Sequence, residues 1–185
     1  MAGVLEKRHM QFTVVLVNIE NPGNVAAIMR TCDAVGIQDI YLLTTRQPRE
    51  KIWKRRASRS AEKWITLHEF SDTKECFSEL LRHYPQVLAT HLGQEAIDLY
   101  SLNLQQPTAF VFGNEEHGLD EAVLQFCTGN IVIPQIGMLP SLNISVACAV
   151  TLYEAYRQNT EEGGVTLNPL PAERINQLHK LWTEA

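Results

Sequence analysis

Apolar positions follow two different spacings along this chain, and each change of spacing marks a new element. Residues 12–19 are alternating and rich in β-branched side chains, which is typical of a strand. After a turn at residues 21–23, apolar residues recur at helical spacing from Val25 to Val35, and Gly36 is placed to end the helix. This part of the chain therefore predicts a strand, a loop and a helix.

The same alternation continues over most of the chain. Strands are expected at residues 37–43, 64–67, 87–91, 108–112 and 130–133, and helices at residues 72–83, 119–126 and 141–158. This order predicts an α/β fold with a mostly parallel sheet covered by helices on both faces. We expect one domain over residues 1–160 and a helical tail of the same domain over residues 161–185.

The helix expected at residues 141–158 is apolar around most of its circumference. No charged residue occurs between Ser141 and Glu154, and Ala147, Cys148 and Ala149 are small enough to let another helix approach closely. Such a helix must be covered on nearly all sides, either by its own sheet and neighbouring helices or by a second subunit. We favour a homodimer and keep a buried intramolecular helix as the alternative.

The composition agrees with a globular domain, because 45% of the 185 residues are hydrophobic and 20% are charged. No apolar run approaches the roughly 18 residues of a membrane span, and no signal peptide is recognisable, so we expect a cytoplasmic protein without membrane contact. The cysteines at positions 32, 76, 127 and 148 are widely spaced and are expected to pack as small hydrophobes. The histidines show no ligand spacing, so no metal is expected.

Basic residues are concentrated between Arg46 and Lys63, although the net charge of the chain is −5. This basic stretch contains eight basic and two acidic side chains, a local net charge of +6. Because screening limits exposed charges to a reach of about 8 Å at physiological salt, acidic residues elsewhere would not prevent it from attracting phosphates. The stretch is therefore either a phosphate-binding surface or a solvated polar loop.

Three segments place polar and glycine residues at the carboxyl end of a predicted strand, where α/β proteins build ligand sites. They are residues 18–31, 110–119 and 133–147. The third delivers Ser141, the expected helix cap, and Asn143 to a helix N-terminus. Together the three loops predict one shared pocket. Neither a dinucleotide-binding glycine motif nor a Gly-Lys-Ser/Thr phosphate loop occurs in the chain.

Arg30 is the basic side chain of the first of these segments. It lies off the apolar stripe of its helix, and its neighbours Gly23, Ala26 and Ala27 are small, so a flat or anionic ligand could approach it closely. The alternative is an ordinary exposed helical arginine.

Taken together, the three segments resemble those of the SpoU (TrmH-type) RNA 2′-O-ribose methyltransferases of the SPOUT class, over residues 10–158. The sequences Ala-Thr-His-Leu at 89–92 and Tyr-Glu-Ala-Tyr-Arg-Gln at 153–158 are most similar to the tRNA guanosine branch. The resemblance implies an S-adenosylmethionine-dependent domain with a C-terminal deep trefoil knot, an exception to the usual unthreaded topologies. It also implies a homodimer whose active site lies near the subunit boundary.

The resemblance assigns roles by position. The implied catalytic residues are Asn24, Arg30, Glu115, Ser141 and Asn143, and the implied cofactor-binding residues are Thr90, Leu92, Gly113, Ile133, Pro134 and Leu142. RNA binding is expected to depend on the basic stretch and on Arg157, with Arg55, Arg56 and Arg59 as its main contacts.

The resemblance implies that a D-loop guanosine of tRNA is methylated. Ribosomal RNA or another tRNA site is the alternative, and an inactive RNA-binding relative is a third interpretation. The family proposal of a general base at Arg30 conflicts with a guanidinium pKa above about 12. We therefore expect Arg30 to clamp the neighbouring phosphate and to stabilise the developing alkoxide.

Overall fold

The structure is a computed structural model that describes residues 2–46, 61–91, 93, 95–160 and 167–184. Its centre is a seven-stranded sheet in the order β3-β2-β1-β6-β4-β7-β5, and all of the pairings between these strands are parallel. The strands are β1 (Phe12–Val17), β2 (Asp39–Leu43), β3 (Thr66–Phe70), β4 (Gln86–Thr90), β5 (Ile97–Asp98), β6 (Thr108–Phe112) and β7 (Gly129–Val132). The expected mostly parallel sheet is confirmed.

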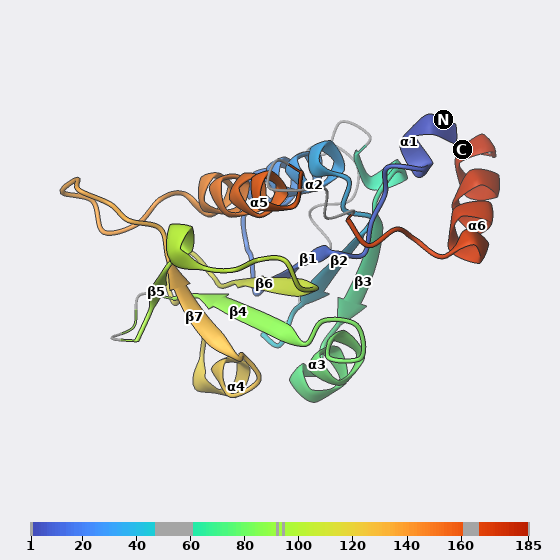
Figure 1. Cartoon of the computed structure of the whole chain (residues 1–185). Coiled ribbons are helices and arrows are strands. Elements are labelled where there is room, and N and C mark those ends of the chain that lie inside the picture. The colour runs from blue at the N-terminus through green and yellow to red at the C-terminus, as the bar shows by residue number, and fades with distance from the viewer. Residues whose placement is uncertain (1, 47–60, 92, 94, 161–166, 185) are drawn as a thin grey trace.

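Helices cover both faces of the sheet, as predicted (Figure 1). Helices α2 (Pro22–Val35) and α5 (Ile144–Thr160) lie on one face, and α3 (Thr73–Leu80) and α4 (Glu121–Leu124) lie on the other. Short 3-10 turns occur at η1 (Ala61–Lys63) and η2 (Leu99–Ser101), and helices α1 (Ala2–Leu5) and α6 (Ala172–Thr183) pack together beside the sheet. Among the described residues, no helix is both long and apolar enough to cross a bilayer.

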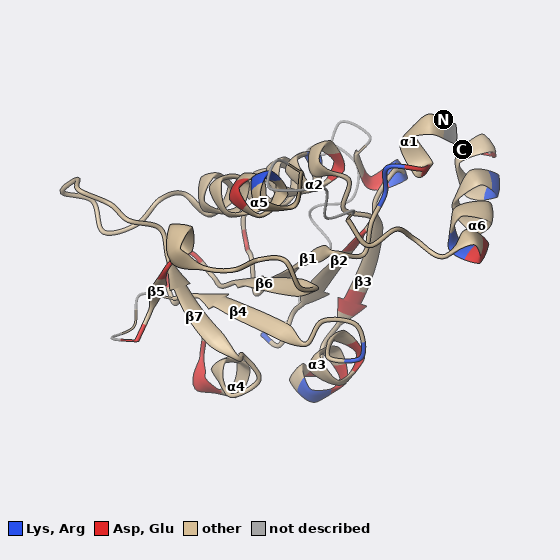
Figure 2. Ribbon diagram, in the orientation of Figure 1, with Lys and Arg blue, Asp and Glu red and all other residues tan. Residues whose placement is uncertain are grey.

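Strand β1 shows why the sheet is covered on both faces. All six of its side chains are buried; Val14 and Leu16 pack towards α2 and α5, whereas Val15 and Val17 pack towards α3 and α4. Strands buried on both sides need continuous apolar sequence. The adjacent central strands β1, β6, β4 and β7 accordingly contain no charged residue (Figure 2).

The caps of α2 follow from its sequence. Asn21 accepts a hydrogen bond from the backbone nitrogen of Gly23 at its N-terminus, and Pro22 occupies the first turn. Gly36 ends the helix in the left-handed conformation, with φ of 88°, as predicted.

The cysteines pack as expected. Cys32, Cys76 and Cys148 are buried in the two cores, and all four cysteines are free. Burial raises the pKa of the Cys76 thiol to about 12 and that of Cys127 to about 11, so both remain protonated at neutral pH. Within the described residues, no cluster of three or more His, Cys, Asp or Glu side chains could hold a metal ion.

The two ends of the chain are joined in a small separate core. The backbone nitrogen of Met10 donates to the carbonyl of Asn168 at 2.7 Å, and Leu5 packs with Leu178 and Trp182. The buried Arg8 guanidinium lies over the Trp182 ring, 5.4 Å from its centroid. This contact holds α6 against the N-terminal segment.

His9 is a buried imidazole in this region, and we expect it to make stability depend on pH. Its Nδ1 accepts from the Gln11 backbone nitrogen at 3.3 Å, and its Nε2 lies 2.9 Å from the Val35 carbonyl, so the ring is neutral with the proton on Nε2. Burial lowers the pKa of His9 from 6.5 to about 4. Its contribution to stability is complete above pH 6.5 and is lost as the pH falls to about 4.

That loss should amount to about 3 kcal/mol. Urea unfolding at several pH values, compared between the natural protein and the His9→Gln variant, measures it. The stability of the variant should vary less with pH between 6.5 and 4. The same pH dependence in both proteins would contradict the assignment.

Candidate active site

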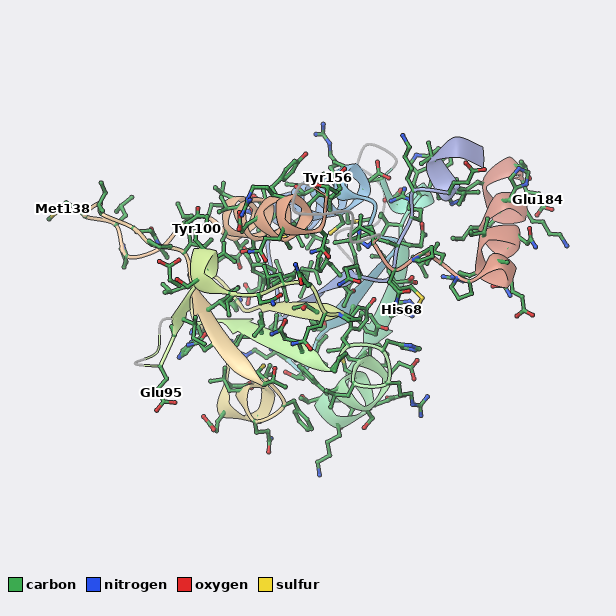
Figure 3. The ribbon with its side chains drawn as sticks, viewed as in Figure 1. His68, Glu95, Tyr100, Met138, Tyr156 and Glu184 are labelled. Atoms are coloured by element: carbon green, nitrogen blue, oxygen red, sulfur yellow. The ribbon has the colours of Figure 1, made fainter. Side chains whose placement is uncertain are left out.

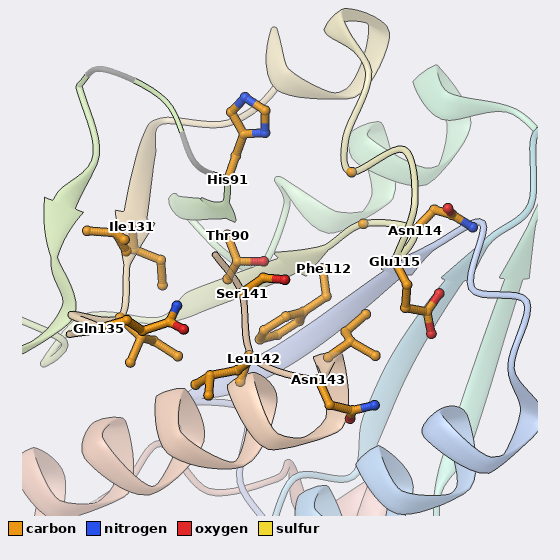
Figure 4. A pocket seen from close by; sticks show the side chains of 16 residues that line it. Thr90, His91, Phe112, Asn114, Glu115, Ile131, Gln135, Ser141, Leu142 and Asn143 are labelled. Carbon is orange, nitrogen blue, oxygen red and sulfur yellow. The ribbon is translucent and has the colours of Figure 1, made fainter. Parts of the chain in front are cut away.

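A pocket of about 520 Å³ lies at the carboxyl ends of β4, β6 and β7, where they meet the start of α5 (Figure 4). This edge is where parallel sheets of α/β proteins bind ligands. The described lining residues are Thr90, His91, Phe112, Gly113, Asn114, Glu115, Gly118, Ile131, Val132, Ile133, Gln135, Ser141, Leu142, Asn143, Ile144 and Ala147. Two of the three predicted loops therefore line this pocket.

The remaining loop, residues 18–31, reaches the pocket through hydrogen bonds. Asn24, in the first turn of α2, donates from Nδ2 to Oε1 of Glu115 at 2.6 Å. Nδ2 of Asn143 donates to Oδ1 of Asn24 at 3.2 Å. One residue from each of the three loops thus joins a single hydrogen-bonded chain, and the predicted convergence of the loops is confirmed.

Helix α5 begins at Ile144, three residues later than predicted. Asn143 takes the capping position: its Oδ1 accepts hydrogen bonds from the backbone nitrogen of Ser145 at 2.9 Å and from the Ser145 hydroxyl at 2.6 Å. The prediction that Ser141 caps this helix is wrong. Ser141 instead lies in the preceding loop, where it lines the pocket.

The loop after β6 is closed on itself. Asn114 and Gly118 exchange two backbone hydrogen bonds, of 3.1 and 2.8 Å, and Gly118 has a positive φ of 63°. Gly113 has no room for a side chain, because a Cβ atom there would lie 2.8 Å from Cγ of Leu119 and closer still to the Gly118 carbonyl. This close approach fixes the backbone that carries Glu115 into the pocket.

Four of the six predicted cofactor residues, Thr90, Gly113, Ile133 and Leu142, line the pocket. Pro134 is not in its lining, although both of its neighbours are, and Leu92 lies outside the described residues. The sequence analysis assigned no site role to His91, Phe112, Gln135 or Ala147, which also line the pocket. Their positions in the pocket depend on which strands are neighbours in the sheet and on where the chain comes back to the pocket. No local sequence pattern reveals either.

Neither Arg30 nor Arg157, the described basic residues predicted for the site, lines this pocket. Among the described lining residues there is no Lys or Arg, and Glu115 and His91 are the ionisable side chains. Arg30 is exposed on α2 and does not line the pocket. Arg55, Arg56 and Arg59 lie outside the described residues.

Arg157 is held by its own helix. Its Nε and NH2 atoms each lie 3.0 Å from the Glu154 carboxylate, which also accepts from Nε2 of Gln158 at 2.8 Å. The hydrogen bonds from Arg157 hold the pKa of Glu154 below its usual value. The expected RNA contact of Arg157 stays a prediction, because the partly exposed guanidinium already has this partner.

The pocket has two chemically different sides. The apolar lining residues include Ile131, Ile133, Leu142 and Ala147, and the polar ones include Glu115, Ser141 and Asn143. Glu115 and Asn143 lie towards α2, whereas Ile131 and Leu142 lie on the other side of the pocket (Figure 4). Such a division fits a ligand with a flat apolar part and a charged part.

Comparison with known proteins places this geometry among RNA-modifying enzymes. The model of the SpoU rRNA Methylase family matches residues 11–153. The tRNA (guanosine(18)-2′-O)-methyltransferase of Aquifex aeolicus is 34% identical over 179 residues, which cover 97% of this chain and 84% of that protein.

Two solved structures extend the comparison. The crystal structure of an Aquifex aeolicus TrmH/SpoU tRNA modifying enzyme has a TM-score of 0.86 and 34% identity, covering 99% of this chain and 93% of that one. An AdoMet-bound rRNA methyltransferase from Sinorhizobium meliloti has a TM-score of 0.64 and 26% identity, covering 86% of this chain and 60% of that one.

Proposed function

This chain belongs to the SpoU rRNA Methylase family, and on that premise we propose that it methylates the 2′-hydroxyl of a D-loop guanosine in tRNA, the position named for its relatives. The chain is an S-adenosylmethionine-dependent RNA 2′-O-methyltransferase. The choice of tRNA rests on similarity to the tRNA enzymes over most of the chain. The hydrogen-bonded chain Asn143–Asn24–Glu115 beside the two-sided pocket is the structural observation that carries the site assignment.

The residues of the pocket fit S-adenosylmethionine. Ile133 and Leu142 on the apolar side would hold the adenine, Thr90 and Gly113 would hold the cofactor from the strand ends, and the neighbouring Leu92 and Pro134 are included from the family resemblance. When bound, the cofactor supplies a methyl group on a sulfonium as the electrophile. Burying it between strand ends and α5 aligns the two reactants, and alignment can lower the barrier by about 7–11 kcal/mol.

The polar side would hold the ribose. As the oxygen of the 2′-hydroxyl attacks the methyl carbon, the hydroxyl proton passes to water and the bond from the methyl carbon to sulfur breaks, so partial negative charge develops on that oxygen in the transition state. Ser141 and Asn143 can orient the sugar through hydrogen bonds, and Glu115, fixed by Asn24, organises the loop around the cofactor. Arg30 would clamp the adjacent phosphate and stabilise the developing alkoxide, an effect that can be worth about 3–4 kcal/mol.

We also propose a homodimer, because α5 has an uncovered apolar stripe. Cys148, Leu152 and Ala155 are buried, yet Val146, Tyr153 and Tyr156 on the opposite side of α5 are 37–54% exposed. The preceding loop extends away from the body and exposes Met138 completely, while Tyr156 lies on the outer surface of α5 (Figure 3). Nonpolar stripes of this kind are typical of subunit interfaces.

The same dimer would bring Arg30 to a pocket. Because α2 packs against α5 and directs its buried residues inward, the exposed Arg30 lies on the outer surface of the same helical layer. Arg30 lies about 9 Å further along the axis of α2 than Asn24, on the side away from the pocket of its own chain. In a dimer whose two-fold axis is perpendicular to α5, the two α5 helices are antiparallel, and the partner's pocket end would lie near Arg30.

The trefoil knot is supported by strand order. Strand β7 is the last strand in the sequence, yet it lies between β4 and β5 in the sheet. Strand β7 is therefore inserted between strands formed earlier in the chain, and the segment to α5 leaves the sheet from this inner position. We infer that this segment is threaded as the family resemblance implies.

Labelled S-adenosylmethionine and total cellular RNA test the substrate proposal. We expect label in the tRNA fraction and none in ribosomal RNA. Label confined to ribosomal RNA would overturn the tRNA assignment. Absence of label together with no heat of cofactor binding in calorimetry would favour an inactive RNA-binding relative. A tRNA substrate is compatible with the cytoplasmic location expected from the sequence.

A further inference from the structure

Asn18 lies at the end of β1 in an unusual backbone conformation. Its φ is 53°, and it is the one residue other than glycine with a positive φ in the described part of the chain. Asparagine tolerates this left-handed conformation better than most residues, although it still costs energy. Such conformations persist where the surrounding contacts determine them, often at functional sites.

The side chain of Asn18 is tied to the residues after β2. Its Oδ1 accepts hydrogen bonds from the backbone nitrogens of Thr45 at 2.9 Å and Arg46 at 3.4 Å, and its Nδ2 donates to the Thr45 hydroxyl at 3.0 Å. Its backbone nitrogen donates to the Leu43 carbonyl at 2.9 Å. These contacts fix the direction of the Asn18 carbonyl.

That carbonyl accepts a hydrogen bond from the loop that carries Glu115. Nδ2 of the buried Asn114 donates to it at 2.9 Å. Oδ1 of Asn114 in turn accepts from the backbone nitrogens of Glu116 at 2.9 Å and His117 at 3.1 Å. Glu115 lies between these anchored positions, with its carboxylate directed at Asn24.

We propose that Asn18 is a positioning residue that acts through Asn114 to hold the Glu115 carboxylate against Asn24. The inference rests on the proposed function, because it assigns a supporting residue to that site. Asn18 is not in the lining of the pocket, so its effect on methyl transfer must pass through the loop. Both asparagines are buried, so water does not readily replace the bonds between them.

Two variants separate the side chain of Asn18 from its backbone conformation. Asn18→Gly keeps the left-handed backbone without strain but removes the bonds to Thr45 and Arg46, and we expect about tenfold lower kcat at saturating cofactor and tRNA. Asn18→Asp keeps the acceptor oxygen, and the Thr45 hydroxyl can rotate to donate to it, so kcat should stay within about twofold of the natural protein.

Asn103→Gly is the matched control. Asn103 is exposed, and its Oδ1 accepts from the Gln105 backbone nitrogen at 2.9 Å, a bond of the same type outside the pocket. This variant should keep the natural kcat and melting temperature. When Asn18→Gly is added to the Glu115→Gln variant, kcat should not fall further, because both changes remove the same positioned carboxylate.

Amide hydrogen exchange gives a readout that does not depend on activity. Exchange at Glu116 and His117 should be faster in Asn18→Gly than in the natural protein and unchanged in Asn103→Gly. Natural exchange at these amides, natural kcat in Asn18→Gly, or independent losses in the Glu115→Gln background would overturn the inference. Absence of methyl transfer by the natural protein would instead contradict the proposed function.

Discussion

Replacing Arg30 with alanine is expected to lower the rate of methyl transfer by about 100- to 1,000-fold, the loss typical of removing one group that stabilises an oxyanion. Binding of S-adenosylmethionine should be unchanged, because Arg30 does not line the pocket. Single-turnover rates with tRNA and calorimetry with the cofactor measure the two quantities. A parallel loss of cofactor affinity would contradict the proposed placement.

Arg30→Lys distinguishes a clamp from a general base. Lysine releases a proton far more readily than arginine but cannot make a planar two-point contact with a phosphate. We expect the Arg30→Lys enzyme to stay slow at pH 9. Near-natural turnover at that pH would favour a general base at position 30.

Mixed dimers show which subunit supplies Arg30. If Arg30 acts on the partner's pocket, mixing the strongly impaired Arg30→Ala and Glu115→Gln proteins and letting their subunits exchange creates one intact site in each mixed dimer. A one-to-one mixture should then recover about a quarter of the natural activity, because about half of the dimers are mixed. Recovery of no activity from a mixture shown to exchange subunits would place Arg30 in the site of its own chain.

Gly113→Ala should weaken S-adenosylmethionine binding by about 10- to 100-fold, since overpacking of this kind costs about 1–3 kcal/mol. The added methyl group would collide with the Gly118 carbonyl and lie 2.8 Å from Cγ of Leu119. Backbone atoms cannot move aside as a flexible side chain can, and Gly118 is itself bonded to Asn114. The loop must therefore open and displace Glu115.

Gly3→Ala is the matched control, because a Cβ atom at Gly3 meets nothing within 4 Å. Calorimetry should give natural cofactor affinity for this variant, and thermal melting should show that both variants are folded. Natural affinity in Gly113→Ala would mean that the loop after β6 does not belong to the cofactor site.

Periodicity predicted the larger elements because each buries a continuous apolar face. The helix ending at Gly36 and the strand over residues 108–112 agree with the structure, as does the parallel sheet. Strand β5 has two residues and helix α1 has four, which is too short for any period to be recognised. The start of α5 was misplaced because Ser141 and Asn143 are both good capping residues, and a contact with Asn24 distinguishes them.

The site was predictable to the extent that strand ends gather in a parallel sheet. Asn24, Glu115 and Asn143 meet as expected, although up to 119 positions separate them in the chain. The contributions of His91 and Gln135 to the pocket depend on which strands are neighbours. The helical position of Arg30 placed it off the apolar stripe, in agreement with its exposure, but its absence from the pocket lining of its own chain could not be read from the sequence.

Methylation of two tRNA transcripts that differ in one oxygen tests the central claim most directly. One carries guanosine at position 18, the position named for the relatives, and the other carries 2′-deoxyguanosine there. With labelled S-adenosylmethionine, the account predicts 2′-O-methylguanosine in the first transcript and no label in the second. Equal labelling of both transcripts, or of neither, would contradict it.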